Sequence, residues 1–127
     1  MSGGETALRL LAGALTDAPG LALEHEPVPA DQVVAGSPTT AYRALDAAEA
    51  GEIGVWEMSV GAMRDVEVDE VFVVLAGAAT VEFEHVPSTG RPGDPIVLAP
   101  GAVVRLEAGM KTIWTVREPL RKVFIER

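Results

Sequence analysis

The sequence predicts an all-β domain, a sandwich or small barrel, with a short N-terminal helical arm. Its 127 residues suit one domain, and because it has no cysteine, packing and not disulfides must hold its core. After residue 52, short Val- and Ile-rich runs are interrupted by Gly, Pro or Asp about every 8–12 residues. Val81 and Phe83 alternate with Glu82 and Glu84, a pattern typical of a strand with one buried face and one wet face.

The strand pattern divides the second half of the chain into short segments. We expect strands over 53–60, 71–75, 79–84, 96–98, 103–106, 112–116 and 123–125. The stretch from 40 to 50 stays open at this point. Its alanines and Leu45 favour a helix, whereas Thr39, Thr40 and Tyr42 favour the start of a strand.

The first 37 residues are expected to form an arm and a connector, and residues 38–127 the barrel. Leu8, Leu11, Ala12 and Leu15 have the spacing of one helical stripe. Because the polar face of this helix is not basic, we expect it to pack on the barrel or on a partner subunit and not on a membrane. Residues 19–38 are rich in Pro and Gly, which predicts a connector with one edge strand at most.

Charge and composition narrow the classes of partner. The net charge is −9 and the sequence pI about 4.6, so nucleic acid and anionic membranes should repel the chain. No basic leader and no apolar run of about 20 residues is present, so we expect a cytoplasmic protein without membrane contact.

The usual catalytic motifs are missing. The chain contains no glycine-rich phosphate loop of the dinucleotide or nucleotide type. Ser59 lacks the strand–turn–helix setting of an activated serine, so we interpret it as structural. His25 and His85 stand 60 residues apart beside carboxylates, and we interpret both as solvated rather than as one shared metal site.

An acidic run, 64–70, leads into the apolar run 71–77. We interpret Asp65, Glu67 and Asp69 as a solvated loop. Glu70 differs, because a period of two places it on one face with Phe72 and Val74. If that face is the interior, the carboxylate needs a cation or hydrogen-bond donors.

Several segments together resemble a cupin. They are 54–61, 69–77, 98–101, 108–109, 114–116 and 121–124, within a resemblance that spans about residues 38–126. The chain is most similar to small single-domain cupins of the (S)-ureidoglycine aminohydrolase and ethanolamine-utilisation group. The resemblance implies a jelly-roll β-barrel, commonly dimeric, and it favours a strand over 40–46.

The metal motifs of that family are degenerate here. Glu70 and Gly77 keep the family's spacing of glutamate and glycine, but the histidine positions fall on Arg64 and Val66, or on Met63 and Asp65. In the second motif, Thr112 stands in the histidine place. One of four usual ligands survives, and a lone carboxylate is too weak for Mn, Fe, Ni or Zn, so we expect no metal and no cofactor.

An oxygen-ligand site for Mg or Ca, built from Asp65, Glu67 and Glu70, stays open as an alternative. We expect instead that Arg64 pairs with Glu70 where a metal would sit. Met58 and Phe72 also suit an ordinary core, and the two tryptophans are the better pocket residues. The expected ligand-binding residues are Trp56, Met58, Arg64, Glu70, Phe72, Thr112 and Trp114.

Three classes of function fit the sequence. The first is a metal-free cupin that binds a small polar or anionic molecule in the barrel, as a sensor or accessory protein. The second is an aminohydrolase-, isomerase- or lyase-like enzyme that uses Glu70 as its acid or base. The third is a structural dimer module whose barrel is filled by side chains. In each class we expect a homodimer.

Overall fold

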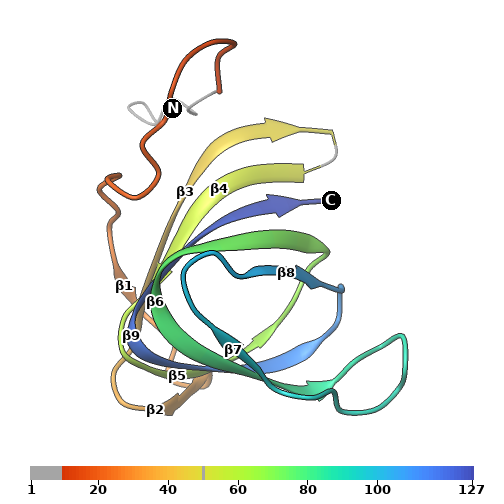
Figure 1. Cartoon of the computed structure of the whole chain (residues 1–127). Coiled ribbons are helices and arrows are strands. Elements are labelled where there is room, and N and C mark those ends of the chain that lie inside the picture. The colour runs from red at the N-terminus through yellow and green to blue at the C-terminus, as the bar shows by residue number, and fades with distance from the viewer. Residues whose placement is uncertain (1–9, 50) are drawn as a thin grey trace.

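The computed structural model describes residues 10–49 and 51–127, and their strands form a curled antiparallel sheet (Figure 1). Its strands follow in chain order: β1 (Glu26–Pro27), β2 (Val33–Ala35), β3 (Thr39–Ala48), β4 (Gly51–Met58), β5 (Gly61–Val66), β6 (Glu70–His85), β7 (Ile96–Leu98), β8 (Val103–Leu106) and β9 (Lys111–Glu126). The all-β prediction is confirmed.

Two long strands, β6 and β9, pair with each other along most of their length and form the spine of the sheet. On its other side, β9 pairs first with β5, through residues 111–116, and then with β4, through residues 120–125. Likewise β6 pairs with β8 near its start and with β7 further on. Each long strand therefore changes its second neighbour halfway, and the sheet curls on itself.

The change of neighbours occurs where Gly77 faces Pro119. Gly77 has φ +99°, a conformation that side chains disfavour, and the register between β6 and β9 shifts around it. Pro119 has no N–H to give to a ladder. A Cβ on Gly77 would lie 2.2 Å from the Pro119 carbonyl oxygen. The two strands expected on either side of Gly77 are thus one strand with a bend, and so are the two expected on either side of Pro119.

The concave face of the sheet holds the core. Glu70, Phe72 and Val74 are buried, as their alternation predicts, while the residues between them are half-buried. The same holds for Thr112, Trp114 and Val116 on β9. The buried apolar cluster is Val28, Met58, Met63, Phe72, Val74, Ala79, Val81, Leu98, Leu106, Trp114, Val116, Leu120 and Phe124.

Two segments show where local sequence is a poor guide. The stretch 39–48 is strand β3, as the family resemblance implies and against its alanine-rich helix propensity, because pairing with β4 outweighs local preference. The segment 61–66 is strand β5, paired with β9. Its charged residues do not have the apolar pattern that predicts a strand, so the sequence did not indicate it. The interpretation of Asp65 as part of a loop is wrong.

The predicted helical arm is wrong for the residues that the structure describes. From residue 10 to 18 the chain forms turns and no helix, and Leu8 lies outside the described residues. Leu11 and Leu15 are 66% and 87% exposed. A helix this short needs its apolar stripe buried to be stable, and here Leu11 and Leu15 of the stripe are left exposed to solvent. Within 10–49 and 51–127, no helix is long and apolar enough to cross a membrane.

Replacing Gly77 by alanine should disrupt the bend. We expect Gly77→Ala to lower the free energy of unfolding by more than about 3 kcal/mol, because a positive φ and a backbone clash add up. Gly90→Ala is the matched control, since φ is +71° there but nothing lies within 4 Å of a new Cβ. It should cost about 1 kcal/mol. Urea unfolding measures both, and equal losses would contradict this account of the bend.

Candidate functional site

A pocket of about 440 Å³ lies between β3, β4, β5, β6 and β9. Five acidic side chains, one basic side chain and four aromatic ones dominate its lining. The lining residues are Tyr42, Glu52, Trp56, Asp65, Val66, Glu67, Val68, Glu70, Trp114, Lys122, Phe124 and Glu126. This volume is within the range of small-molecule sites.

Lys122 places a buried ammonium group at this pocket. Its Nζ donates a hydrogen bond of 2.8 Å to Oε2 of Glu70, and both side chains are less than a tenth exposed. The same nitrogen lies 4.3 Å from the ring centre of Phe72, 4.8 Å from that of Trp114 and 4.9 Å from that of Trp56. Cation–π attraction of this kind strengthens when water is excluded. One carboxylate and three rings therefore hold the charge.

The strand register explains why a lysine faces inward. Trp56 of β4 is the cross-strand partner of Lys122 on β9. On β9, Leu120, Lys122 and Phe124 are buried and alternate with less buried residues. The period of two thus carries Lys122 inside together with its apolar neighbours.

Glu67 forms a second buried polar group. Its Oε2 accepts hydrogen bonds of 2.6 Å from the hydroxyl of Thr112 and 2.9 Å from the indole N–H of Trp114. The indole N–H also lies 3.1 Å from the Thr112 hydroxyl. This network fixes the orientation of the Trp114 ring that packs against Lys122.

Burial dominates the protonation of the pocket carboxyls. It raises the pKa of Glu67, and the nearby charge of Asp65 adds to this effect while the bonds from Thr112 and Trp114 oppose it. Burial likewise raises the pKa of Asp65. The pKa of Glu70 is also raised by burial, although Lys122 opposes the shift. All three groups hold protons more tightly than free carboxyls do.

The structure brings part of the expected site together. Trp56, Glu70 and Trp114 line the pocket. Phe72 lies against Lys122 but does not line the pocket. Thr112 does not line the pocket either, and it donates a hydrogen bond to Glu67, which does. Met58 is fully buried among the core residues.

The expected pair between Arg64 and Glu70 is wrong. Arg64 is exposed on β5 and donates a hydrogen bond of 2.8 Å to Glu84 of β6, while Lys122 takes the place beside Glu70. Strand alternation explains the difference, because Met63 points into the core and its neighbour Arg64 therefore points out.

Sequence reasoning missed Lys122, and it interpreted Asp65 and Glu67 as solvated, although Glu67 is buried and both line the pocket. Tyr42 and Phe124 were also missed as lining residues. A usable signal was present for Lys122, since a period of two places it on the same strand face as Leu120 and Phe124.

The residues here do not fit a cupin metal site. Among residues 10–49 and 51–127, no three His, Cys, Asp or Glu side chains form a group that would hold a metal ion. The pocket lining contains no histidine, and a lysine ammonium contacts the one carboxylate that matches a family ligand position. An ammonium cannot be a ligand and repels a cation, so the donor set opposes a metal.

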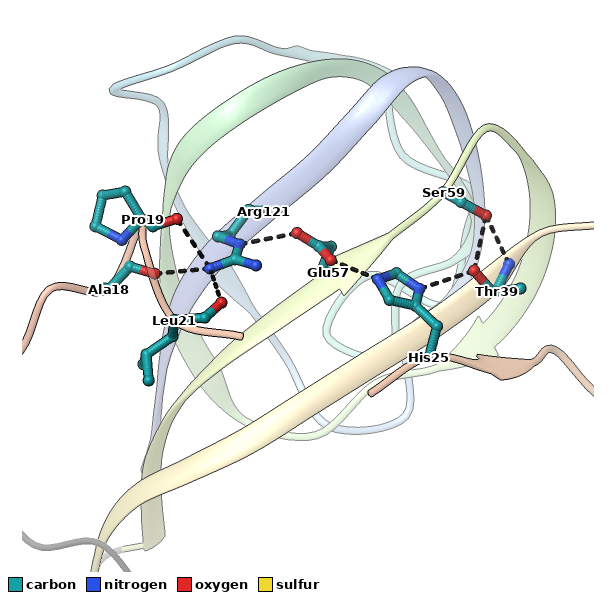
Figure 2. A network of polar contacts seen from close by, with 8 residues as sticks. All are labelled: Ala18, Pro19, Leu21, His25, Thr39, Glu57, Ser59 and Arg121. Carbon is teal, nitrogen blue, oxygen red and sulfur yellow. Dashed lines mark hydrogen bonds and ion pairs between the residues drawn. The ribbon is translucent and has the colours of Figure 1, made fainter. Parts of the chain in front are cut away.

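His25 belongs to a different polar network, outside the barrel (Figure 2). Its Nε2 lies 2.5 Å from Oε2 of Glu57, and its Nδ1 lies 2.8 Å from the hydroxyl of Thr39, which in turn bonds Ser59. Glu57 also accepts a hydrogen bond of 2.8 Å from Arg121. Burial raises the pKa of Glu57, but the bonds from Arg121 and His25 outweigh it and leave that pKa lowered.

Arg121 uses this network to fasten the N-terminal connector to the sheet. Its Nη1 donates hydrogen bonds to the carbonyl oxygens of Ala18, Pro19 and Leu21 at 2.9, 3.0 and 2.8 Å (Figure 2). Figure 1 shows this part of the chain running along the outside of β3 and β4. Arg121 and Lys122 are neighbours, so β9 anchors the connector on one face and the pocket on the other.

Replacing Glu67 by glutamine should stabilise the protein at high pH. Because its folded-state pKa is raised, wild-type Glu67 contributes stability that is present at acid pH and lost as pH rises through that pKa. Glutamine keeps the acceptor oxygen but has no charge to bury. We expect Glu67→Gln to be more stable than wild type by on the order of 1 kcal/mol at pH 8, with the gap closing towards pH 4. Urea unfolding across pH measures this. The exposed control Glu82→Gln should show little change, and a Glu67→Gln variant less stable at pH 8 would contradict the assignment.

The chain is similar in fold to several solved structures. No curated protein is similar enough to count as a relative. Among solved structures, a DUF861-family protein of unknown function from Pseudomonas syringae pv. tomato has a TM-score of 0.66 at 18% identity, and covers 83% of this chain. This chain spans 44% of that protein's length. The Clostridium difficile EutQ protein has a TM-score of 0.60 at 17% identity, over 85% of this chain and 81% of its own.

A third similar structure is a DUF1255 protein of unknown function from Acidithiobacillus ferrooxidans, with a TM-score of 0.56 at 18% identity. The match covers 89% of this chain and all of that protein. At such identities the likeness concerns the fold. The sequence model of the EutQ-like cupin domain matches residues 45–124, which include β4 to β8 and most of β9. The chain therefore belongs to the family of EutQ-like cupin domains.

Proposed function

We propose that this cupin binds a small polar molecule in the pocket around Lys122, without a metal, as a sensor or accessory protein. The observation that carries the proposal is the 440 Å³ pocket itself, which combines apolar rings with buried, hydrogen-bonding carboxyls. Such a mixture suits a ligand that is held by its apolar part and oriented by its polar groups. A barrel filled by its own side chains would leave no such space, so the structural-module alternative is weaker.

The charge of the pocket narrows the class of ligand. Five acidic side chains line it against the single positive charge of Lys122, and Glu70 and three rings already engage that charge. An anionic ligand would meet repulsion, whereas a neutral or positively charged ligand would not. We therefore favour a neutral or cationic molecule over the anionic one that the sequence left open.

Acid–base catalysis is the second candidate. Asp65, Glu67 and Glu70 share one pocket, and burial raises the pKa of each. Carboxyls with raised pKa values hold their protons more tightly, which suits them to donate and take back protons in catalysis. Chemical change of a bound molecule, in place of simple binding, would identify this activity.

Homodimer formation and a cytoplasmic location remain part of the proposal. Exposed apolar side chains such as Val97 and Val103, 73% and 66% exposed, are compatible with a covered face. Light scattering after size exclusion measures the oligomeric state directly.

The two tryptophans offer a direct test of binding, because the chain has only Trp56 and Trp114 and both line the pocket. Their indole N–H signals in ¹⁵N NMR therefore report on this site. We expect butylammonium and 1-butanol to shift both signals at millimolar concentration, and butyrate of the same length to do so least, because of the acidic lining. Strongest binding of butyrate would contradict the charge argument. No shift with any of the three would contradict a ligand-binding pocket.

A further inference from the structure

Lys122 is one of only two lysines in the chain, and the two lie in opposite environments. Lys111 begins β9 and is exposed, whereas Lys122 is 5% exposed and lines the pocket. A primary amine is the group that condenses with aldehydes and ketones. The pocket thus contains a nucleophile that simple binding does not require.

We propose, building on the ligand pocket proposed above, that Lys122 captures a small neutral aldehyde or ketone as a reversible iminium. The ligand class is thus a carbonyl compound, and Lys122 is the residue that bonds to it. Because the lining is acidic, the ligand carries no carboxylate or phosphate of its own.

The reaction balances with the groups present. Glu70, whose Oε2 lies 2.8 Å from Nζ, accepts a proton from the ammonium and leaves a free amine. The nitrogen lone pair attacks the carbonyl carbon, a C–N bond forms, and a proton passes from nitrogen to the former carbonyl oxygen to give a carbinolamine. A carboxyl group then returns the proton to that hydroxyl, the C–O bond breaks, and water leaves as the C=N bond forms. The ammonium and the carbonyl compound become one iminium and one water.

The surroundings of Lys122 suit the product as well as the starting amine. An iminium is a cation, so Phe72, Trp114 and Trp56 stabilise it through the same ring faces that contact the ammonium. The positive charge facing Glu70 is likewise kept. Formation of the iminium therefore preserves most of the cation–π and ionic attraction that stabilises the Lys122 side chain in its buried position.

The pocket carboxyls can carry out the proton transfers that condensation requires. Glu67 and Asp65 line the same pocket, and burial raises the pKa of both, so each favours its protonated, proton-donating form more than a free carboxyl does. Loss of water from a carbinolamine requires such a donor.

Reductive trapping on the wild-type protein tests the proposal. The protein is incubated with butanal and cyanoborohydride at neutral pH, and peptide mapping by mass spectrometry locates the trapped butyl groups. We expect Lys122 to be trapped at least about tenfold faster than Lys111, although Lys111 is the more accessible, because the pocket holds the aldehyde beside the buried amine. Glyoxylate, an aldehyde with a carboxylate, should be trapped at Lys122 more slowly than butanal.

Two variants test whether trapping at Lys122 depends on the pocket. Lys111→Arg should leave trapping at Lys122 unchanged, and Glu67→Gln should slow it several-fold without changing trapping at Lys111. Because Lys122→Arg risks misfolding, the comparison of the two lysines in the wild-type protein is the deciding one. Trapping at Lys111 as fast as at Lys122 would overturn the proposal.

The same experiment separates this inference from the proposed function. 1-Butanol has the shape of butanal but no carbonyl group. If it shifts the indole signals while butanal leaves Lys122 untrapped, ligand binding stands and iminium formation is refuted. If neither 1-butanol nor butylammonium shifts those signals and butanal is not trapped at Lys122, both proposals fail.

Discussion

A single buried ammonium group organises the interior of this cupin. Lys122 is expensive to bury alone, because removing a charge from water costs several kcal/mol. Glu70 and three aromatic rings compensate for that loss. The aromatic side chains are in turn oriented around the charge, with Trp114 fixed through Glu67. The shape and the charge of the pocket both follow from how Lys122 is accommodated.

The bend at Gly77 and Pro119 makes this arrangement possible. It lets β9 pair with β5 before the bend and with β4 after it, so Trp114 and Lys122 reach the same pocket from two halves of one strand. Alternation along β9 then turns Arg121 outward, where it holds the connector through the carbonyls at 18, 19 and 21. Strand β9 thus contributes both to the contacts of the N-terminal connector outside the sheet and to the pocket inside it.

Strand periodicity made much of this fold predictable from the sequence. Contacts that depend on pairing between strands distant in the sequence could not be predicted in this way. The inward face of Glu70 follows from a period of two, and the resemblance identified β3 correctly. The partner of Glu70 did not follow, since Lys122 lies 52 residues away and only the register between β6 and β9 brings it close. Asp65 and Glu67 were interpreted as solvated because acidic residues favour water, and only the fold reveals that both line the pocket.

Glu70 and Lys122 depend on each other for stability, and a double-mutant cycle measures this dependence directly. Urea unfolding of wild type, Glu70→Gln, Lys122→Met and the double variant gives the coupling energy. Each single change leaves the other charged side chain buried without its ion-pair partner. We therefore expect losses of about 3 kcal/mol each and a double variant that loses clearly less than their sum, by roughly 2 kcal/mol. Losses that add within about 0.5 kcal/mol would show that the two side chains are independent and would contradict the account.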